Sequence, residues 1–237
     1  MSRLQPARGT SDLLPSAMAA HRRVIDTARD AAGLYGFQEM ATPIFEFGEV
    51  FSRPLGDSSD VVTKETYNFT DRGGETLTLR PENTAGVVRA MISNGLTQSL
   101  PLKFFYAGPM FRYERPQKGR MRQFHQIGIE YLGPRDGLAD AEIIACGARV
   151  LASLGVLDRC KLHLNSLGDT ESRQAYRAAL LTFLESHASE LSVDSQARLQ
   201  TNPLRILDSK DEGDRAILEN APRLDGYPVS YTHLTLP

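Results

Sequence analysis

The chain has 237 residues, is 41% hydrophobic and 24% charged, and carries a formal net charge of −2. This composition is typical of a globular protein with one large or two modest domains, and the net charge argues against a protein that coats nucleic acid over its whole surface. Cys146 and Cys160 form no CxxC pair, so we expect two buried thiols in a reducing cytoplasm and neither a zinc site nor a disulfide. The amino terminus has no apolar signal core and no segment approaches the length of a membrane span, so a cytoplasmic protein without membrane contact is expected.

Helix and strand signals alternate through the first part of the chain. The predicted elements are, in order, a helix ending near Gly33, strands at 37–41, 67–70 and 75–80, and a helix from Pro81 to about Asn94. The first helix is expected to begin at Ser11, Asp12 and Pro15, which are residues that favour helix starts. An Asp-Arg-Gly-Gly sequence lies between the second and third strands, and this turn chemistry predicts a hairpin.

The stretch from 103 to 133 is the most informative part of the sequence. An apolar run at 103–111 and an alternating run at 123–131 flank a basic loop, which predicts an antiparallel hairpin. Side chains alternate between the two faces of a strand. One face of the second strand should carry Phe124, Gln126, Gly128 and Glu130, and the other, expected in the core, should carry His125, Ile127, Ile129 and Tyr131.

The last part of the chain is mostly helical. Helices are predicted at 140–154 and 170–187, a strand at 161–165, and short helices in a charged region from 191 to 220. The whole predicts an α+β fold, with an antiparallel sheet flanked by helices. Neither GxxxxGK[ST] nor GxGxxG occurs, so any phosphate site must depend on arginines and strands instead of a glycine-rich loop.

The residues of the hairpin suggest a binding platform for a charged, planar ligand. Arg112 and Glu114 share a face of their strand, so an arginine, two carboxylates, an amide and an aromatic ring come together. Each feature also has a simpler interpretation. The basic loop is compatible with a solvated hairpin, Glu82 with an acid favoured by the dipole of a helix start, and Phe124 with core packing.

Four stretches together resemble one family, the histidyl-tRNA synthetases, which are class II aminoacyl-tRNA synthetases. They are GTSDLLP at 9–15, the segment 36–43 that ends in proline, TLRPENTAG at 78–86, and the hairpin 111–133 with its QFHQxxxE sequence. A further stretch, NPLRILDSKD at 202–211, is also similar to the family. One departure is Asn83, where many members have glycine; the flanking Glu82 and Thr84 are intact.

The resemblance implies a histidine–tRNA ligase. Such an enzyme activates L-histidine with ATP to histidyl-adenylate and transfers the histidyl group to tRNA(His). Charge builds on the phosphoryl oxygens when the histidine carboxylate attacks the α-phosphorus, so a fixed guanidinium is most useful there, and Arg112 is the candidate. By resemblance Glu114 faces the adenine, Phe124 stacks on its ring and Arg120 reaches the outer phosphates, which Mg²⁺ would bridge.

The resemblance also assigns the amino-acid site and the partners. Glu82, Asn83, Thr84 and Gln126 belong to the histidine site, in which Glu82, Thr84 and Gln126 resemble the groups that hold the α-amino group. Glu130 resembles the carboxylate that reads the imidazole, and wrong side chains would leave this acceptor unpaired. The acceptor end of tRNA would lie near Arg115, Lys118 and Arg122, and a homodimer would form through residues 16–43.

The resemblance predicts an incomplete catalytic domain. Residues 1–190 correspond to its amino-terminal part and 191–228 to the start of an inserted helical region, whereas the family's RGLDYY-like segment, a later ATP-binding arginine and the anticodon-binding domain have no counterpart. The sheet would therefore lack strands on its C-terminal side, and we expect the chain alone to bind ATP or histidine poorly and to be inactive in charging tRNA. Residues 229–237, VSYTHLTLP, resemble a translated sequencing-library adapter and are expected to be non-native; the alternative is a genuine β-rich tail.

A regulatory paralogue is the main alternative function. It shares the catalytic fold, senses histidine, activates the ATP phosphoribosyltransferase of histidine biosynthesis and tends to lose the catalytic residues. The presence here of Glu82, Arg112, Glu114, Arg120, Gln126 and Glu130 favours the enzyme. A synthetase-like domain fused to a stress-sensing kinase is a third alternative, and no kinase sequence supports it.

Overall fold

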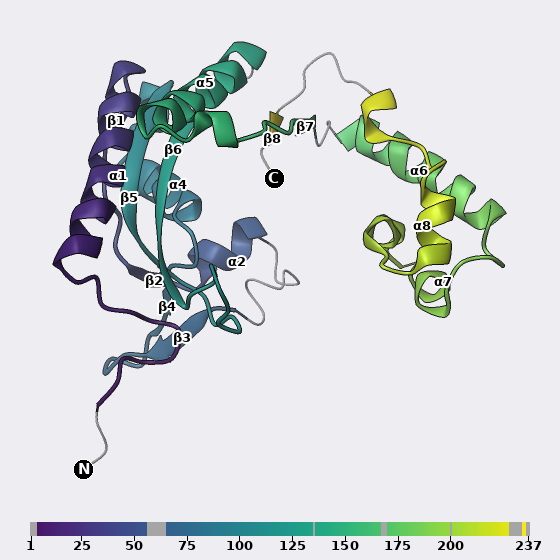
Figure 1. Ribbon diagram of the computed structural model, residues 1–237, viewed down its shortest axis with the longest axis horizontal. Helices are drawn as coiled ribbons and strands as arrows, with labels where there is room; N and C mark the ends of the chain where they lie inside the picture. Colours follow the sequence, from purple (N-terminus) through teal and green to yellow (C-terminus); the bar gives the residue numbers. More distant parts are fainter. Residues whose placement is uncertain are drawn as a thin grey trace. The chain divides into compact units, whose positions relative to one another are not determined.

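The computed structural model describes residues 4–55, 65–134, 136–166, 170–199, 201–227 and 234–235 (Figure 1). Contacts divide the chain into two compact units, one of residues 1–134 and 142–160 and the other of residues 135–141 and 161–237. The first unit contains the central hairpin, and the second is mostly helical. Within the described residues, every helix is too short or too polar to cross a membrane.

The first unit follows the predicted order of elements. It contains α1 (Pro15–Leu34), β1 (Gln38–Glu39), β2 (Phe45–Phe47), α2 (Glu49–Leu55), β3 (Tyr67–Thr70), β4 (Thr76–Leu79), α4 (Thr84–Ser93), the 3-10 turns η1 (Leu96–Ser99) and η2 (Leu157–Arg159), β5 (Leu102–Phe111), β6 (Gln123–Leu132) and most of α5 (Gly137–Ser153). The first helix starts at Pro15 with Leu14 as its N-cap, so Ser11 and Asp12 lie outside it. Proline suits this position because its fixed backbone angle matches the first helical turn and its missing N–H is not needed there.

Two small sheets organise this unit. In the first, β1 pairs in parallel with β5, and β5 pairs antiparallel with β6; in the second, β4 lies between β2 and β3, antiparallel to both. Both predicted hairpins are confirmed, as is the α+β class. In the central hairpin Tyr106 lies opposite Gly128, and Gly108 lies opposite Gln126. Residues that pair in this way share a face of the sheet.

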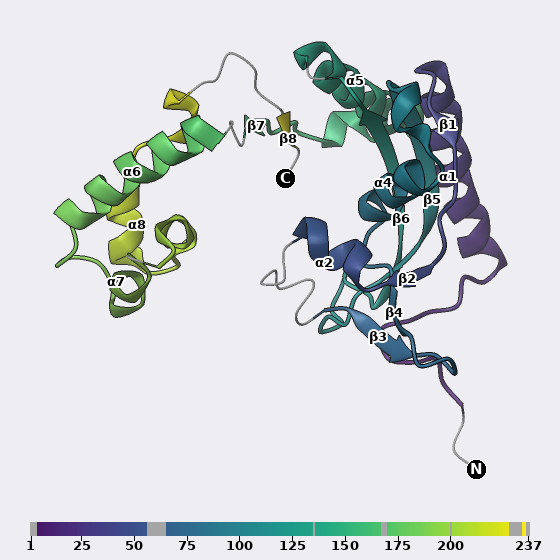
Figure 2. The same cartoon turned by 180° about the vertical axis from the view of Figure 1, so that it is seen from behind.

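Helices cover both faces of the central hairpin, with α1 on one side and α4 on the other (Figures 1 and 2). On the α1 side, Ala28 and Ala32 pack with Phe105 and with Cys146 of α5. On the α4 side, Val87 packs with Tyr106 and Met110. The hairpin is therefore the middle layer of the unit, and its α4 side is the face that carries the candidate site residues.

The expected core face of β6 is only half buried. Ile129 and Tyr131 pack against the cluster around Phe105, as predicted, but Ile127 is 37% exposed and His125 is exposed. The apolar cluster on this face is centred on Phe105, which pairs with Ile129, and it does not include Ile127. His125 instead contacts the ring of His21 from α1, with ring centroids 4.3 Å apart.

The second unit is built around its own apolar cluster. It contains β7 (Asn165–Ser166), α6 (Thr170–Ser186), α7 (Val193–Leu199), η3 (Pro203–Asp208), α8 (Glu212–Leu218), η4 (Leu224–Gly226) and β8 (Leu234–Thr235). Leu180 and Leu184 of α6 are fully buried against Leu191 and Ile206, so α6 packs with the helices that follow it. The break in contacts therefore comes before α6. The predicted boundary at residue 190, between the catalytic portion and an inserted region, stays a prediction.

The structure differs from the sequence-based expectations at one strand and one cysteine. The strand predicted at 161–165 is wrong for 161–164, which have no regular structure, and only Asn165–Ser166 pair, with Leu234–Thr235. Cys146 is buried as expected, but Cys160 is exposed. Apart from Leu234–Thr235, the tail from Val229 to Pro237 lies outside the described residues.

A buried carboxylate joins three segments of the second unit. Asp214 is 0% exposed, and its oxygens accept hydrogen bonds from the backbone of Ser192 and from the hydroxyls of Ser192, Ser195 and Ser209, at 2.6–2.8 Å. Burial alone would raise the pKa of Asp214, but these four bonds outweigh it and lower the pKa to about 2. The carboxylate is therefore charged at neutral pH and ties α7 and η3 to α8.

Candidate functional site

The candidate site lies where the loop before α4 meets the α4-side face of the hairpin. On the hairpin this face carries Phe124, Gln126, Gly128 and Glu130, as the alternation predicted, and the loop contributes Glu82 and Thr84. The hydroxyl of Thr84 donates to Glu130 Oε1 at 2.7 Å. This contact brings together two predicted site residues that are far apart in the sequence.

Gly128 leaves room for a tyrosine ring. A Cβ atom at position 128 would lie 2.2 Å from Cζ of Tyr106 and 2.3 Å from its hydroxyl oxygen, so a larger residue cannot fit without displacing the ring. Tyr106 is 7% exposed, and its hydroxyl lies 3.4 Å from Glu130 Oε1. Glycine within a strand often marks such a close approach.

Glu130 is a carboxylate in a mostly buried setting. Burial raises the pKa of Glu130, as does the nearby negative charge of Glu82, while hydrogen bonds from Thr84 and Tyr106 act in the opposite direction. Burial and the Glu130 carboxylate also raise the pKa of Tyr106, to about 12, so this hydroxyl keeps its proton at neutral pH. The Glu130 carboxylate is thus an acceptor that receives hydrogen bonds from two neutral hydroxyl donors.

Glu82 and Gln126 supply further acceptors. The Glu82 carboxylate accepts from the backbone N–H groups of Thr84 at 2.6 Å and Ala85 at 3.0 Å, which places a negative charge at the start of α4. This agrees with the helix-start interpretation of Glu82, since an acid is favoured at that end of the helix. Gln126 differs, because its Oε1 is buried and has no hydrogen-bond partner among the described residues. A buried acceptor without a partner is costly, so it marks a place where a donor from a ligand would be favourable.

A buried arginine fixes the loop that carries Glu82 and Thr84. Arg80 is 6% exposed; its Nε donates to the carbonyl oxygen of Pro109, and its Nη1 donates to Asn83 Oδ1 and to both oxygens of Thr42, all at 2.9–3.2 Å. Thr42 also donates to Asn83 Oδ1 at 2.6 Å. Asn83 is 1% exposed and turned into this network, so its expected contact with histidine stays a prediction.

The predicted nucleotide residues form a second cluster at the far end of the hairpin. Arg112 donates from Nε to the carbonyl oxygen of Pro81 at 2.9 Å, and its guanidinium carbon lies 5.1 Å from the centre of the Phe124 ring. Glu114 lies between two arginines, 3.9 Å from Arg112 and 3.3 Å from Arg120. Arg112 is therefore attached to the same loop that carries Glu82.

The other cations of the hairpin loop differ in their surroundings. Arg115 and Lys118 are exposed, whereas Arg122 is partly buried over the Tyr113 ring, 4.1 Å from its centre, and donates to the Glu114 carbonyl oxygen at 3.1 Å. The backbone N–H of Arg122 donates to the carbonyl oxygen of Gly9 at 2.7 Å. Arg122 thus helps to join the amino-terminal segment to the hairpin.

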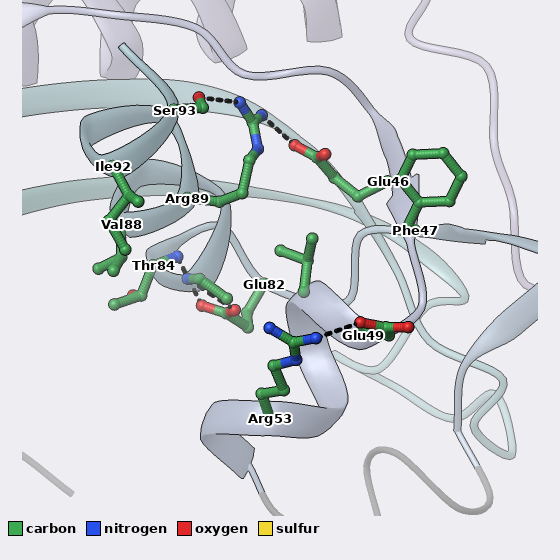
Figure 3. Close-up of a pocket in the computed structure, with 12 residues that line it drawn as sticks. Glu46, Phe47, Glu49, Arg53, Glu82, Thr84, Val88, Arg89, Ile92 and Ser93 are labelled. Atoms are coloured by element: carbon green, nitrogen blue, oxygen red, sulfur yellow. Dashed lines mark hydrogen bonds and ion pairs between the residues drawn. The ribbon is translucent and has the colours of Figure 1, made fainter. Parts of the chain in front are cut away.

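A cavity of about 850 Å³ lies next to the loop, between α2 and α4. Its apolar lining includes Phe47, Val50, Val88 and Ile92, and Glu82 and Thr84 stand at its border. Figure 3 shows Arg89 of α4 crossing this region to reach Glu46 and Ser93. The described residues contain no group of three or more histidine, cysteine or acidic side chains suited to a metal ion.

The sequence analysis did not predict two residues of the site, Tyr106 and Arg80. The sequence favours a packing role for Tyr106, whose position over Gly128 depends on the register of the hairpin. Arg80 directly follows β4, and an arginine at the end of a strand is not a sequence signal for a buried side chain. Each of these side chains occupies space next to a glycine: Gly128, which pairs with Tyr106, and Gly108, where a Cβ atom would lie 2.4 Å from Nη2 of Arg80.

Comparison with known proteins identifies relatives of this chain. The sequence profile of the family described as Histidyl-tRNA synthetase matches residues 9–224. The histidine–tRNA ligase of Rhodospirillum rubrum is 63% identical over 224 residues, which are 94% of this chain and 54% of that protein. That of Gluconacetobacter diazotrophicus is 63% identical over 227 residues, or 96% of this chain and 55% of that protein. The chain therefore spans about half the length of the curated relatives it matches.

Solved structures support the same relationship. The apo histidyl-tRNA synthetase of S. aureus superposes with a TM-score of 0.72 at 34% identity, over 96% of this chain and 51% of that one. A Bacillus halodurans protein described as an ATP phosphoribosyltransferase regulatory subunit/histidyl-tRNA synthetase shares the fold, with a TM-score of 0.57 at 21% identity over 93% of this chain and 60% of that one. With a family profile that extends over most of its residues and relatives that are 63% identical, the chain belongs to the histidyl-tRNA synthetase family.

Proposed function

We propose that this chain is the amino-terminal part of a histidine–tRNA ligase and that it contributes the histidine-binding loop and much of the ATP site. The whole protein would activate L-histidine with ATP and transfer the histidyl group to tRNA(His). The observation that carries the proposal is the buried, unpartnered Oε1 of Gln126 on the face that also bears Glu130. A histidine molecule offers N–H donors at both of its ends, which is the property such a face requires.

Histidine would be held at two points. Its α-ammonium group donates to Gln126 Oε1, Glu82 and Thr84, and its imidazole N–H donates to Glu130. Asn83 acts through the position of the loop, because its side-chain oxygen already accepts from Thr42 and Arg80. Side chains without an N–H at the right place would leave the Glu130 carboxylate without a donor from the substrate, which gives discrimination.

ATP would bind at the far end of the hairpin. The adenine stacks on Phe124 beside Glu114, Arg112 holds the α-phosphate, and Arg120 exchanges its contact with Glu114 for the outer phosphates. Mg²⁺ would supply further positive charge to these phosphates. The attachment of Arg112 to the Pro81 carbonyl sets its distance from the histidine loop. Arg112 thereby stabilises charge on the phosphoryl group that the histidine carboxylate attacks.

The remaining partners follow from the surface of the first unit. The exposed Arg115 and Lys118, with Arg122 behind them, would contact the acceptor end of tRNA. Residues 16–43 would form a homodimer interface, since α1 and the following segment carry exposed apolar residues such as Val24 and Leu34. The protein would act in the cytoplasm.

Substitution of Gln126 tests the histidine site. Gln126→Leu removes the unpartnered oxygen, and we expect about a tenfold weaker affinity for L-histidine, because the buried ammonium group loses an acceptor. Histidine-induced shifts in ¹⁵N–¹H NMR spectra, measured up to tens of millimolar, give the affinity. Gln123→Leu, on the opposite face of the same strand, is the matched control and should not change it.

Two results would contradict this function. Absence of any histidine-dependent shift in the unaltered chain would remove its basis. Histidine binding without any ATP binding would instead favour the regulatory paralogue.

A further inference from the structure

Tyr106 lies next to the proposed histidine site but is not among the residues assigned to contact histidine. It lies on β5 directly across from Gly128, and a Cβ atom on residue 128 would come within 2.2 Å of its ring. The ring is 7% exposed and packs beside Val87 of α4. The ring therefore occupies the space above Gly128 and is confined there by the helix.

This position brings the hydroxyl to Glu130, two residues beyond Gly128 on the same face of β6. The Tyr106 hydroxyl lies 3.4 Å from Glu130 Oε1, and the Thr84 hydroxyl lies 2.7 Å from the same oxygen. The Tyr106 bond is the longer and weaker of the two. Both donors reach Oε1, so among the described residues Oε2 receives no hydrogen bond from a side chain or the backbone.

We propose that Tyr106 is a positioning residue for imidazole recognition, whose hydroxyl, together with Thr84, fixes Oε1 of Glu130 and leaves Oε2 free for the imidazole N–H. This inference rests on the proposed function, because it takes Glu130 as the group that reads the imidazole. Tyr106 itself does not touch the substrate. It acts through the orientation and the charge of the carboxylate.

The electrostatics of the site make this support useful. Burial and the negative charge of Glu82 both disfavour an ionised Glu130, whereas the two hydroxyl donors favour it. Without the Tyr106 hydroxyl, the pKa of Glu130 would be higher, and its carboxylate would lose one of the two hydrogen bonds that orient it.

Tyr106→Phe removes the hydroxyl and keeps the ring over Gly128, so it tests the role with little change in packing. The pKa of Glu130, followed by ¹³C NMR of the glutamate side chains, should rise in this variant. Its affinity for L-histidine at neutral pH should fall about two- to tenfold, as expected for one lost hydrogen bond. Thr84→Val, which removes the 2.7 Å bond to the same oxygen, should raise the pKa of Glu130 as well.

Tyr131→Phe is the matched control. Tyr131 lies on the other face of β6, under the ammonium group of Lys103 at 4.5 Å from its ring centre, and its loss of a hydroxyl should alter neither quantity. An unchanged pKa of Glu130 in Tyr106→Phe would overturn the inference, as would equal histidine affinity in the two tyrosine variants. Failure of the unaltered chain to bind histidine would instead contradict the proposed function, and the ligand-free pKa measurement distinguishes these cases.

Discussion

Gly128 is a site residue at which no side chain fits without displacing a neighbour. The Tyr106 ring occupies the space that a side chain at position 128 would take. Both residues lie in the central hairpin, the middle layer of the first unit. We expect Gly128→Ala to lower the free energy of unfolding by about 1–3 kcal/mol, because the ring must move within a packed layer. Urea denaturation of the variant and the unaltered chain measures this difference.

Gly147→Ala provides the matched control for that substitution. Gly147 is exposed within α5, and a Cβ atom there meets nothing within 4 Å. Alanine in the interior of a helix is favoured over glycine, so this variant should gain about 0.5–1 kcal/mol. A loss of stability in both variants would show that glycine replacement itself, and not the tyrosine ring, is responsible.

At the scale of elements, Asp214 joins α7, η3 and α8 through three serines. Its pKa is lowered from 3.8 to about 2 on folding, so its contribution, roughly 2–3 kcal/mol, is fully present above pH 4. The contribution is lost as the pH falls from about 4 to about 2, because the unfolded chain then binds the proton first. Asp214→Asn should be less stable at neutral pH and should lack this part of the acid dependence, which urea denaturation at a series of pH values would measure.

The longer helices and both hairpins could be predicted from the sequence, because periodicity and turn chemistry are local properties, whereas β2 and the short helix α2 were not predicted. The Asp-Arg-Gly-Gly turn and the alternation of 123–131 were sufficient to predict both antiparallel pairs. The roles of Tyr106 and Arg80 could not be predicted, since each depends on which residue faces it across another segment. Ile127 was assigned to the core and is 37% exposed. Alternation predicts which face of a strand a residue lies on, but it does not predict how much of that face the apolar cluster covers.

At the scale of the whole molecule, the two units have separate apolar clusters. Leu184 is fully buried in the cluster of the second unit, and Val87 is fully buried in the α4-side cluster of the first. We expect Leu184→Ala to weaken the second unit by about 2–5 kcal/mol through the cavity it leaves, without loosening the hairpin. Hydrogen exchange measured by mass spectrometry should then show faster exchange in 170–227 and unchanged protection in β5 and β6.

Val87→Ala should give the reverse pattern. Exchange should become faster in the hairpin and stay unchanged in 170–227. If either variant accelerates exchange in both units to the same extent, the chain unfolds as one cooperative body.

The contact between Gly9 and the hairpin has a practical consequence for shortening the protein. Leu4 is 95% exposed, so the amino-terminal segment could be mistaken for a dispensable tail. Yet the carbonyl oxygen of Gly9 accepts the N–H groups of Arg122 and Gln123, and its backbone has a φ of +84° that suits glycine. We therefore expect an affinity tag in place of residues 4–6 to be tolerated. Removal of Gly9 would take two hydrogen bonds from the start of β6 and leave that end held by its pairing with Phe111, so we expect it to be less stable.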